Sequence, residues 1–207
     1  SARGGGQGHG QVSSGGGGST EAARSLRLGI VSDTFGNLDA LERALELFVR
    51  AQAERVFFLG GRVSDLEAVL ARRGPPTTGP LRNVVKVASR ACPEYEAKAV
   101  PRKQVDLVDG RVACLVHDKS ELSRDDIENA VLILHGNSAQ AALVGIGPRC
   151  FVTPGHLRSP APNGSPATFV LLDAGPVLVE MTVFSEDARE LRKEKITLQR
   201  VTKLSVK

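Results

Sequence analysis

Two hydrophobic periods alternate along the first half of the folded part of the chain. Short apolar runs predict buried strands, and the stretches between them repeat apolar residues every three or four positions, as amphipathic helices do. The predicted strands are 26–33, 55–61 and 83–89, and the predicted helices are 37–53 and 64–73. The order strand, helix, strand, helix, strand predicts a parallel sheet with helices packed against its faces.

Details of the two helices support this interpretation. The apolar face of the first helix is formed by Leu38, Leu41, Leu45 and Phe48. Ser64, followed three residues later by Glu67, has the spacing of a capping box and predicts the start of the second helix.

The second half of the chain changes to the period of strands. A hairpin is expected about Asp109-Gly110, a short acidic helix at 123–130, a buried strand at 131–137, a second hairpin about 174–176, and a last strand running to the end of the chain. The fold class predicted is α/β, with a two-layered β core (a β-sandwich) flanked by helices. In this single domain the strand ends of the first half face one cleft.

The beginning of the chain differs in composition from the rest. Residues 1–25 are mostly Gly, Ser and other small or polar residues, which cannot bury enough apolar surface to fold, so they predict a flexible linker or tail. The single domain is expected to span 26–207. Because the only methionine is Met181, we expect a chain that has lost its leading residues or is a piece of a longer protein.

Composition narrows the function classes. No apolar run approaches the roughly 18 residues that a membrane-spanning helix needs. The net charge of +4 is scattered and only 4% of residues are aromatic, so nucleic acid is an unlikely partner. The three cysteines, Cys92, Cys114 and Cys150, are odd in number and lack CxxC spacing, which argues against a disulfide framework and favours a reducing, cytoplasmic location.

The end of the first strand carries candidate chemistry. This strand ends on Ser32-Asp33, and a Gly36-Asn37 turn leads into the helix. Ligand sites in parallel sheets gather at the carboxyl ends of strands, so a carboxylate here suggests a metal or phosphate site. Phe35, however, occupies the place where a second ligand would be expected.

Seven segments in order resemble the calcineurin-like metallophosphoesterases. They are GIVSDTFGNLDALERAL, RVFFLGGRVSD, VVKVASRAC, GRVACLVHD, AVLILHGNS, CFVTPGH and ATFVLLDAGPVLVEMTVF. The resemblance extends from Leu26 to about Leu198, and it is greatest to the small bacterial and archaeal phosphodiesterases and to the retromer subunit built on the same fold. It implies two metal ions about 4 Å apart that bind phosphate and activate a water molecule.

Most of the metal ligands that this resemblance implies are replaced. Asp33 and His117 match two of the seven ligand positions. The other five positions hold Phe35 for the first histidine, Gly61 for the bridging aspartate, Arg90 for the asparagine, and Gly136 and Ser138 for the last two histidines. Without the bridging carboxylate, and with a fixed positive charge from Arg90, the sequence predicts that no binuclear centre forms.

Several interpretations of these residues stay open at this point. Asp33 and Arg90 are expected to form an ion pair, and His117 to be a hydrogen-bonded core or rim residue. Phe35 either fills the vacant pocket or presents its ring to a bound partner or ligand. The histidine of the Pro-Gly turn, His156, is expected to be exposed.

An alternative alignment, shifted by one residue, would place His135 and Asn137 at the two histidine positions. Together with Asp33, His117 and His156, these residues would form a rearranged site for a single metal ion.

The sequence therefore predicts a catalytically inactive phosphoesterase-fold protein, a pseudoenzyme with no catalytic residues, no metal and no cofactor. Its expected role is protein binding, as a scaffolding or regulatory domain, and its expected partner is another protein. One alternative is a residual metal-dependent phosphoesterase that uses the rearranged site. Another is a sensor in which Arg90, beside Phe35, holds a phosphorylated ligand without hydrolysing it.

Overall fold

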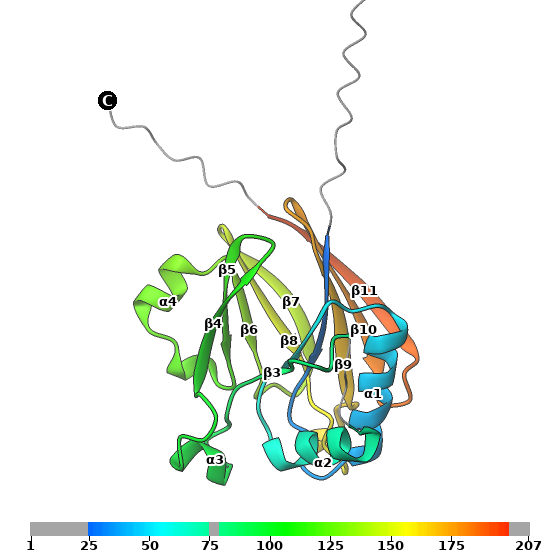
Figure 1. Cartoon of the computed structure of the whole chain (residues 1–207). Helices are drawn as coiled ribbons and strands as arrows, with labels where there is room; N and C mark the ends of the chain where they lie inside the picture. The colour runs from blue at the N-terminus through cyan, green and yellow to red at the C-terminus, as the bar shows by residue number, and fades with distance from the viewer. Residues whose placement is uncertain (1–24, 75–78, 199–207) are drawn as a thin grey trace, which may run out of the picture.

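Two β-sheets packed face to face form the centre of the computed structural model, which describes residues 25–74 and 79–198 (Figure 1). The first sheet has the order β11-β10-β9-β1-β2-β3, and the second has the order β4-β5-β6-β8-β7. This arrangement confirms the predicted fold class of a two-layered β core flanked by helices. Among the described residues, no helix has the length and apolar character needed to cross a bilayer.

The first sheet combines the parallel strands of the first half with the closing strands of the chain. Its strands are β1 (Leu26–Val31), β2 (Arg55–Phe58), β3 (Val85–Lys86), β9 (Thr168–Ala174), β10 (Leu178–Ser185) and β11 (Glu190–Thr197). β1, β2 and β3 pair in parallel, as predicted, and β9 and β10 form the predicted hairpin. The part of the last predicted strand beyond residue 198 lies outside the described residues.

Two helices cover the outer face of this sheet, α1 (Leu38–Arg50) and α2 (Val63–Arg73) (Figure 1). The predicted apolar face of α1 is confirmed, because Leu41, Leu45 and Phe48 are fully buried. The ring of Phe48 packs directly on Gly29 of β1, where any side chain would overlap it. Glycine at this position therefore sets how closely α1 approaches the sheet.

The predicted capping box at Ser64 is wrong. α2 begins one residue earlier, at Val63, after an N-cap residue, Arg62, whose side chain makes no capping hydrogen bond. The earlier start buries Val63 in the core, which outweighs the local preference of the serine. A capping box is formed instead at the acidic helix α4 (Arg124–Asn129), between Ser123 and Asp126.

The second sheet contains the hairpin predicted about Asp109-Gly110. Its strands are β4 (Lys103–Val108), β5 (Arg111–Val116), β6 (Leu132–His135), β7 (Ala141–Ile146) and β8 (Arg149–Pro154). The sequence patterns did not predict β7, because its alanines and glycine have low strand propensity. The short elements α3 (Pro93–Glu96), η1 (Lys119–Glu121) and η2 (Pro162–Gly164) lie in connections.

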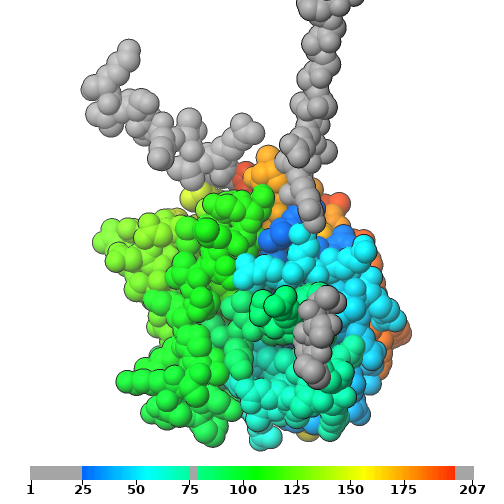
Figure 2. All heavy atoms as spheres, viewed as in Figure 1, coloured from blue at the N-terminus to red at the C-terminus, as the bar shows by residue number. Residues whose placement is uncertain are grey.

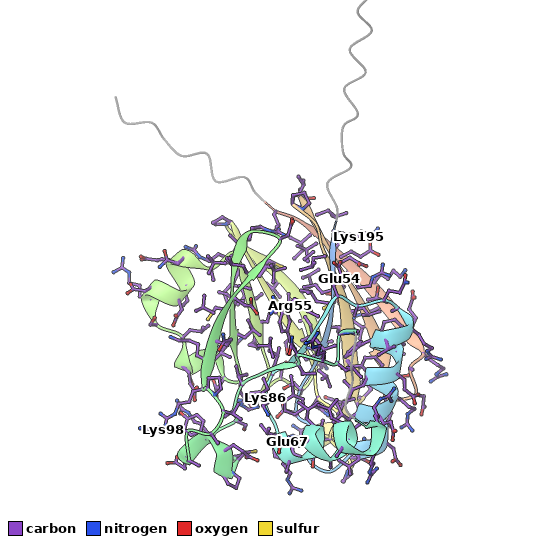
Figure 3. All side chains as sticks on the ribbon, viewed as in Figure 1. Glu54, Arg55, Glu67, Lys86, Lys98 and Lys195 are labelled. Carbon is purple, nitrogen blue, oxygen red and sulfur yellow. The ribbon has the colours of Figure 1, made fainter. Side chains whose placement is uncertain are left out.

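The two sheets enclose one continuous apolar cluster that includes Leu28, Ile30, Phe57, Leu115, Leu134 and Val170. Near the start of β2, Arg55 (labelled in Figure 3) spans the sheets and forms a bidentate ion pair with Asp106 of β4. Lys86 of β3 pairs with Glu67 of α2 at 2.9 Å, also labelled there. In the space-filling view, the green β4–β5 region and the cyan segment around α2 meet along a continuous surface (Figure 2).

The strand directions bring several chain segments to one end of the sandwich. β5, β6 and β8 are mutually parallel, and together with β1 and β2 they end at the lower end in Figure 1. The described chain begins and ends at the opposite end of the sandwich. The segments that follow these five strands therefore form the candidate site.

Candidate functional site

Asp33 is the centre of this end of the sandwich. It lies two residues beyond β1 in the left-handed region, with φ 53°, and its side chain is 1% exposed. Its main-chain N–H donates to the carbonyl of Gly60, 2.9 Å away. The turn after β1 is thus bonded to the turn after β2.

The carboxylate of Asp33 accepts four hydrogen bonds from the protein. Oδ1 accepts from His117 Nε2 at 3.0 Å and from Arg158 Nη2 at 3.2 Å. Oδ2 accepts from the main-chain N–H of Asn137 at 3.0 Å and from Ser32 Oγ at 2.9 Å, whose single proton also faces the Leu59 carbonyl at 3.0 Å. An ionised carboxylate offers about four lone-pair positions to hydrogen-bond donors. Donors from the protein itself therefore fill the positions that a ligand would need.

These partners also decide the ionisation of Asp33. Burial disfavours its charged form, but the hydrogen bonds from His117 and Ser32 and the positive charge of Arg158 together outweigh that effect. The pKa of Asp33 is therefore lowered below its ordinary value. The group is a carboxylate at neutral pH, held by donors on all sides.

The predicted ion pair between Asp33 and Arg90 is not formed. Arg90 points to the outside, with its side chain 60% exposed, and its Nε donates to Glu121 Oε1 at 2.5 Å. The hydroxyl of Tyr95 donates to the same oxygen at 2.9 Å, so Glu121 holds this loop away from the cleft. The positive charge expected from Arg90 comes instead from Arg158, which the sequence analysis missed. The only signal was its place in the PGHLR segment that follows β8.

Phe35 lies at the rim of the site and does not line the cavity beside Asp33. Its ring is half-buried, and it stacks under the guanidinium of Arg158, whose central carbon is 3.9 Å from the ring centroid. A second guanidinium, that of Arg62, is 5.9 Å from the same centroid. The ring therefore supports Arg158 rather than filling the pocket.

His156 is buried, contrary to the prediction that it would be exposed, because the turn after β8 folds back under β9. It is 1% exposed, and its Nδ1 accepts a hydrogen bond from the main-chain N–H of Arg158 at 3.1 Å. Burial lowers the pKa of His156, which favours the neutral ring. With Nδ1 accepting, the proton is assigned to Nε2, which is fully buried and lies near the main chain of Ser165 without a well-formed hydrogen bond.

The shifted alignment that placed His135 in the cleft is also wrong. Side chains alternate along β6, so Leu134 enters the core between the sheets and His135 lies on the outer face. Its Nδ1 donates to the carbonyl of Gly136 at 3.0 Å. Asn137 reaches Asp33 through its main chain only, because its side-chain amide donates to Asp118 Oδ2 at 2.9 Å.

Asp65 is a second residue that the sequence analysis missed. Its carboxylate is buried, and Oδ2 accepts from Thr34 Oγ1 and from the main-chain N–H of Gly36, both at 2.7 Å. It thereby fixes the loop that carries Asp33 and Phe35. Asp65 stands four residues after Gly61, at the start of a helix. The sequence therefore indicated only that it belongs to that helix, and gave no sign of its contacts with the loop.

A small cavity opens beside Asp33, with a volume of about 130 Å³. It is lined by Asp33, Asn137, Ser138, Ala139, His156, Arg158 and Pro162. Four of the ten predicted pocket residues line this cavity: Asp33, Asn137, Ser138 and His156. His117, Gly61 and Gly136 lie behind it, against Asp33 or Ser32, whereas Phe35, Arg90 and His135 lie outside it. Within residues 25–74 and 79–198, no group of three or more His, Cys, Asp or Glu side chains is placed to hold a metal ion.

No protein-family model and no curated protein sequence matches the chain. Solved structures do match. A conserved protein from Streptococcus pneumoniae TIGR4, described as a predicted phosphoesterase, has a TM-score of 0.62 at 15% identity, over 85% of this chain and 99% of its own. Vps29 from Chaetomium thermophilum has a TM-score of 0.61 at 14% identity, and the match covers 84% of this chain and 100% of Vps29. The E. coli phosphoesterase YfcE has a TM-score of 0.55 at 18% identity, and the match covers 84% of this chain and 100% of YfcE.

The chain has the metallophosphoesterase fold. The resemblance inferred from the seven sequence segments is thereby confirmed for the architecture, over nearly the full length of each of these relatives. At these identities the comparison establishes the fold, and the function has to be argued from this chain's own residues.

Within this metallophosphoesterase fold, two positions expected to carry metal ligands are closed by the main chain. Gly61, in place of the bridging aspartate, has φ +99°, and a Cβ on it would lie 2.9 Å from Asp33 Cα. Gly136, in place of a histidine, has its α-carbon against the carbonyl of Leu59 and the hydroxyl of Ser32, so that a Cβ would overlap both. The turns after β2 and β6 therefore occupy the space that ligand side chains would need.

Proposed function

We propose that this protein is a catalytically inactive member of the metallophosphoesterase fold, a pseudoenzyme that works as a protein-binding, scaffolding or regulatory domain. The observation that carries the first part is the carboxylate of Asp33, whose acceptor positions are taken by His117, Arg158, Ser32 and Asn137. Two-metal hydrolysis needs this carboxylate to be free for a cation.

The charge of Arg158 adds to the obstacle. A cation bound to Oδ1 of Asp33 would stand close to Arg158 Nη2, which is 3.2 Å from that oxygen. At a separation of about 4 Å and an effective dielectric near 20, two unit positive charges repel by about 4 kcal/mol, and a dication by more. His156 offers no compensation, because the ring nitrogen not used by Arg158 carries the proton.

Metal analysis tests this part of the proposal. After incubation with Mn²⁺ or Zn²⁺ and desalting, we expect the full chain to retain far less than one metal ion per molecule and to show no turnover of a chromogenic phosphodiester. An Asp33→Ala variant should give the same values. Stoichiometric metal with turnover, both lost in that variant, would instead establish the alternative of a phosphoesterase with a rebuilt site.

The outer face of β7 and β8 supports the second part of the proposal, protein binding. Val144 and Ile146 are 46% and 58% exposed there. The cavity that they line has a volume of about 220 Å³, and its other lining residues are Ala142, Phe151, Thr153, Lys119, His135 and Ser138. Grouped apolar side chains on a surface are typical of contact sites for other proteins. The Chaetomium thermophilum Vps29 has been crystallised with a cyclic peptide, which supports a binding role for this fold.

Variants of this surface, the β7–β8 face, test the protein-binding role. Replacing Val144 and Ile146 with aspartate should weaken the complex with a partner captured by the wild-type chain by about 30-fold, the loss of one interface hot spot. The affinity is measured by titration calorimetry with the purified partner. Leu191→Asp is the matched control, since Leu191 is 44% exposed on β11 of the other sheet. Unchanged affinity of the double variant would place the binding surface elsewhere.

A further inference from the structure

The cavity on the β7–β8 face has room for one side chain, but not for a drug-sized ligand. Its volume is about 220 Å³, whereas sites for drug-sized ligands measure roughly 300–1,000 Å³. Its walls are mainly apolar. Val144 lies opposite Phe151 in the pairing of β7 with β8, and Ile146 follows two residues along on the same face. A single protruding side chain of another molecule therefore fits this cavity best.

The edge of β7 is closed to an added strand. The main-chain N–H of Leu143 donates to Glu194 Oε2 at 3.1 Å, and the carbonyl of Ala141 accepts from Arg192 Nη2 at 2.7 Å. Side chains of β11 thus take the main-chain groups that an incoming strand would need. A partner at this surface therefore binds through side chains on the face of the sheet.

His135 places one hydrogen-bond acceptor in the wall of this cavity. Its Nδ1 donates to the carbonyl of Gly136 at 3.0 Å, so in the neutral ring Nε2 carries the lone pair. Burial lowers the pKa of His135, which favours this neutral form. Nε2 has no partner among the described residues, and it is not one of the enclosed unpartnered atoms, so it is accessible from the cavity. The group that binds here is therefore a donor.

Lys119 adds a positive charge at the same cavity. Its side chain is exposed and forms no ion pair with any described residue. The neighbouring carboxylates are already bonded elsewhere: Asp118 accepts from Ser120 and Asn137, and Glu121 pairs with Arg90. The ammonium group of Lys119 is thus available to a carboxylate of a partner.

A second cation lies at the other end of the β7–β8 face. Arg149 is the cross-strand neighbour of Ile146, and its guanidinium donates to the carbonyls of Ile127 and Glu128 at the end of α4. No described carboxylate pairs with it. Positive charge at both ends of an apolar surface is complementary to an apolar side chain that is flanked by acidic residues.

The combination of apolar walls and one acceptor selects the type of side chain. Tyrosine and tryptophan each have a large apolar ring with a single O–H or N–H donor, and both are enriched among the residues that dominate binding energies. Phenylalanine would leave His135 Nε2 without a donor, and arginine would be repelled by Lys119.

We propose that the β7–β8 face binds an acidic segment of a partner protein, whose tyrosine or tryptophan side chain enters this cavity. The ring donates a hydrogen bond to His135 Nε2, and a neighbouring carboxylate of the segment lies beside Lys119. This inference rests on the proposed protein-binding function, because it specifies the partner for the same surface.

Titration of the ¹⁵N-labelled full chain with blocked tripeptides Glu-X-Glu, followed by NMR, tests the anchor. With tyrosine or tryptophan as X, we expect shifts of the main-chain amide signals of Val144 and Ile146 and of the His135 Nε2 signal. Phenylalanine as X should bind about threefold to tenfold more weakly, the value of one hydrogen bond. Alanine as X should bind at least about 30-fold more weakly, since it lacks the anchor.

A charge exchange tests the role of Lys119. Lys119→Glu should weaken binding of Glu-Tyr-Glu by about fivefold and tighten binding of Lys-Tyr-Lys by about fivefold, as expected for exposed ion pairs. A variant that merely folds poorly would weaken both. Arg72→Glu is the matched control, because it makes the same charge change at an exposed residue of α2, and it should alter neither affinity by more than about twofold.

His135→Phe should abolish the preference for tyrosine over phenylalanine and leave the preference for either over alanine. Absence of peptide binding, equal affinity for tyrosine and phenylalanine in the wild-type chain, or unchanged charge preference in Lys119→Glu would each overturn the inference. A captured partner that depends on Val144 and Ile146, combined with no peptide binding, would refute only this anchor and retain the protein-binding role.

Discussion

Replacing Asp33 with alanine should lower the free energy of unfolding by about 3 kcal/mol. The substitution leaves the buried His117 Nε2 and the main-chain N–H of Asn137 without their acceptor. A buried donor left unpaired costs about 1–3 kcal/mol, and loss of one partner from a buried ion pair costs about 3–5 kcal/mol. Because the Arg158 side chain is 38% exposed and can turn to water, we expect the lower part of this range.

Urea unfolding at neutral pH measures this change. Asp187→Ala is the control, because Asp187 is exposed in the turn after β10 and should change the free energy of unfolding by less than about 0.5 kcal/mol. A carboxylate that is kept free to bind a metal ion behaves differently. Replacing it in the metal-free protein leaves the free energy of unfolding unchanged, or raises it by removing repulsion between neighbouring carboxylates. A neutral or stabilising Asp33→Ala substitution would therefore contradict the saturated carboxylate described above.

The stabilisation that Asp33 provides should depend on pH, and the same variant measures it. The pKa of Asp33 is lowered in the folded protein relative to its ordinary value of 3.8. Its contribution to stability is thus fully present above about pH 4 and is lost as the pH falls through the folded pKa. The difference in unfolding free energy between wild type and Asp33→Ala should shrink as the pH falls below about 4. If this difference in unfolding free energy grew as the pH fell, the lowered pKa of Asp33 would be contradicted.

Restoring the expected metal ligands should damage the protein instead of reviving a metal centre. Gly61→Asp and Gly136→His are each expected to lower the free energy of unfolding by about 4 kcal/mol. At 61 the new Cβ would lie 2.9 Å from Asp33 Cα at φ +99°, and at 136 it would overlap the Leu59 carbonyl. Overpacking costs about 1–3 kcal/mol or more, and a left-handed backbone adds about 1–2 kcal/mol at 61.

Ser138→His is the matched control for these two variants. It restores the third histidine position, but Ser138 is half-buried at the cavity, where a larger side chain can turn toward solvent. We expect a change in unfolding free energy of less than about 1 kcal/mol. Thermal or urea unfolding gives the stabilities, and elemental analysis gives the metal content. A stable double variant of Gly61 and Gly136 that binds metal would show that the turns can open, contrary to the closed backbone.

Periodicity predicted the layered fold from the sequence because each helix of the first half buries a single face, whereas β1 and β2 are buried on both faces and form short apolar runs. The apolar spacing of Leu41, Leu45 and Phe48 defined α1, and the Asp109-Gly110 turn defined the β4–β5 hairpin. The pattern failed at β7, where exposed apolar residues and small ones alternate without a polar face. It also failed at Ser64, where burial of Val63 determined the helix start.

β6 shows why alignment by sequence left the site ambiguous. Both of its faces are buried, one between the sheets and the other beneath α4, so its residues form an unbroken apolar run. Such a run does not reveal which side chains point to which face. The choice between Gly136 and His135 at the site therefore required the pairing of β6 with β5 and β8.

The sequence by itself placed Asp33 at the carboxyl end of a strand in a parallel sheet, and the family resemblance placed His117 beside it, although the two residues follow strands of different sheets. Only the tertiary structure decided what surrounds them: Arg158 instead of Arg90, a buried His156, and main chain where ligand side chains were expected. The physical reason is that strands follow local periodicity, whereas the direction of a loop side chain depends on contacts with residues far along the chain. Asp33 obtains one such partner from 125 residues away.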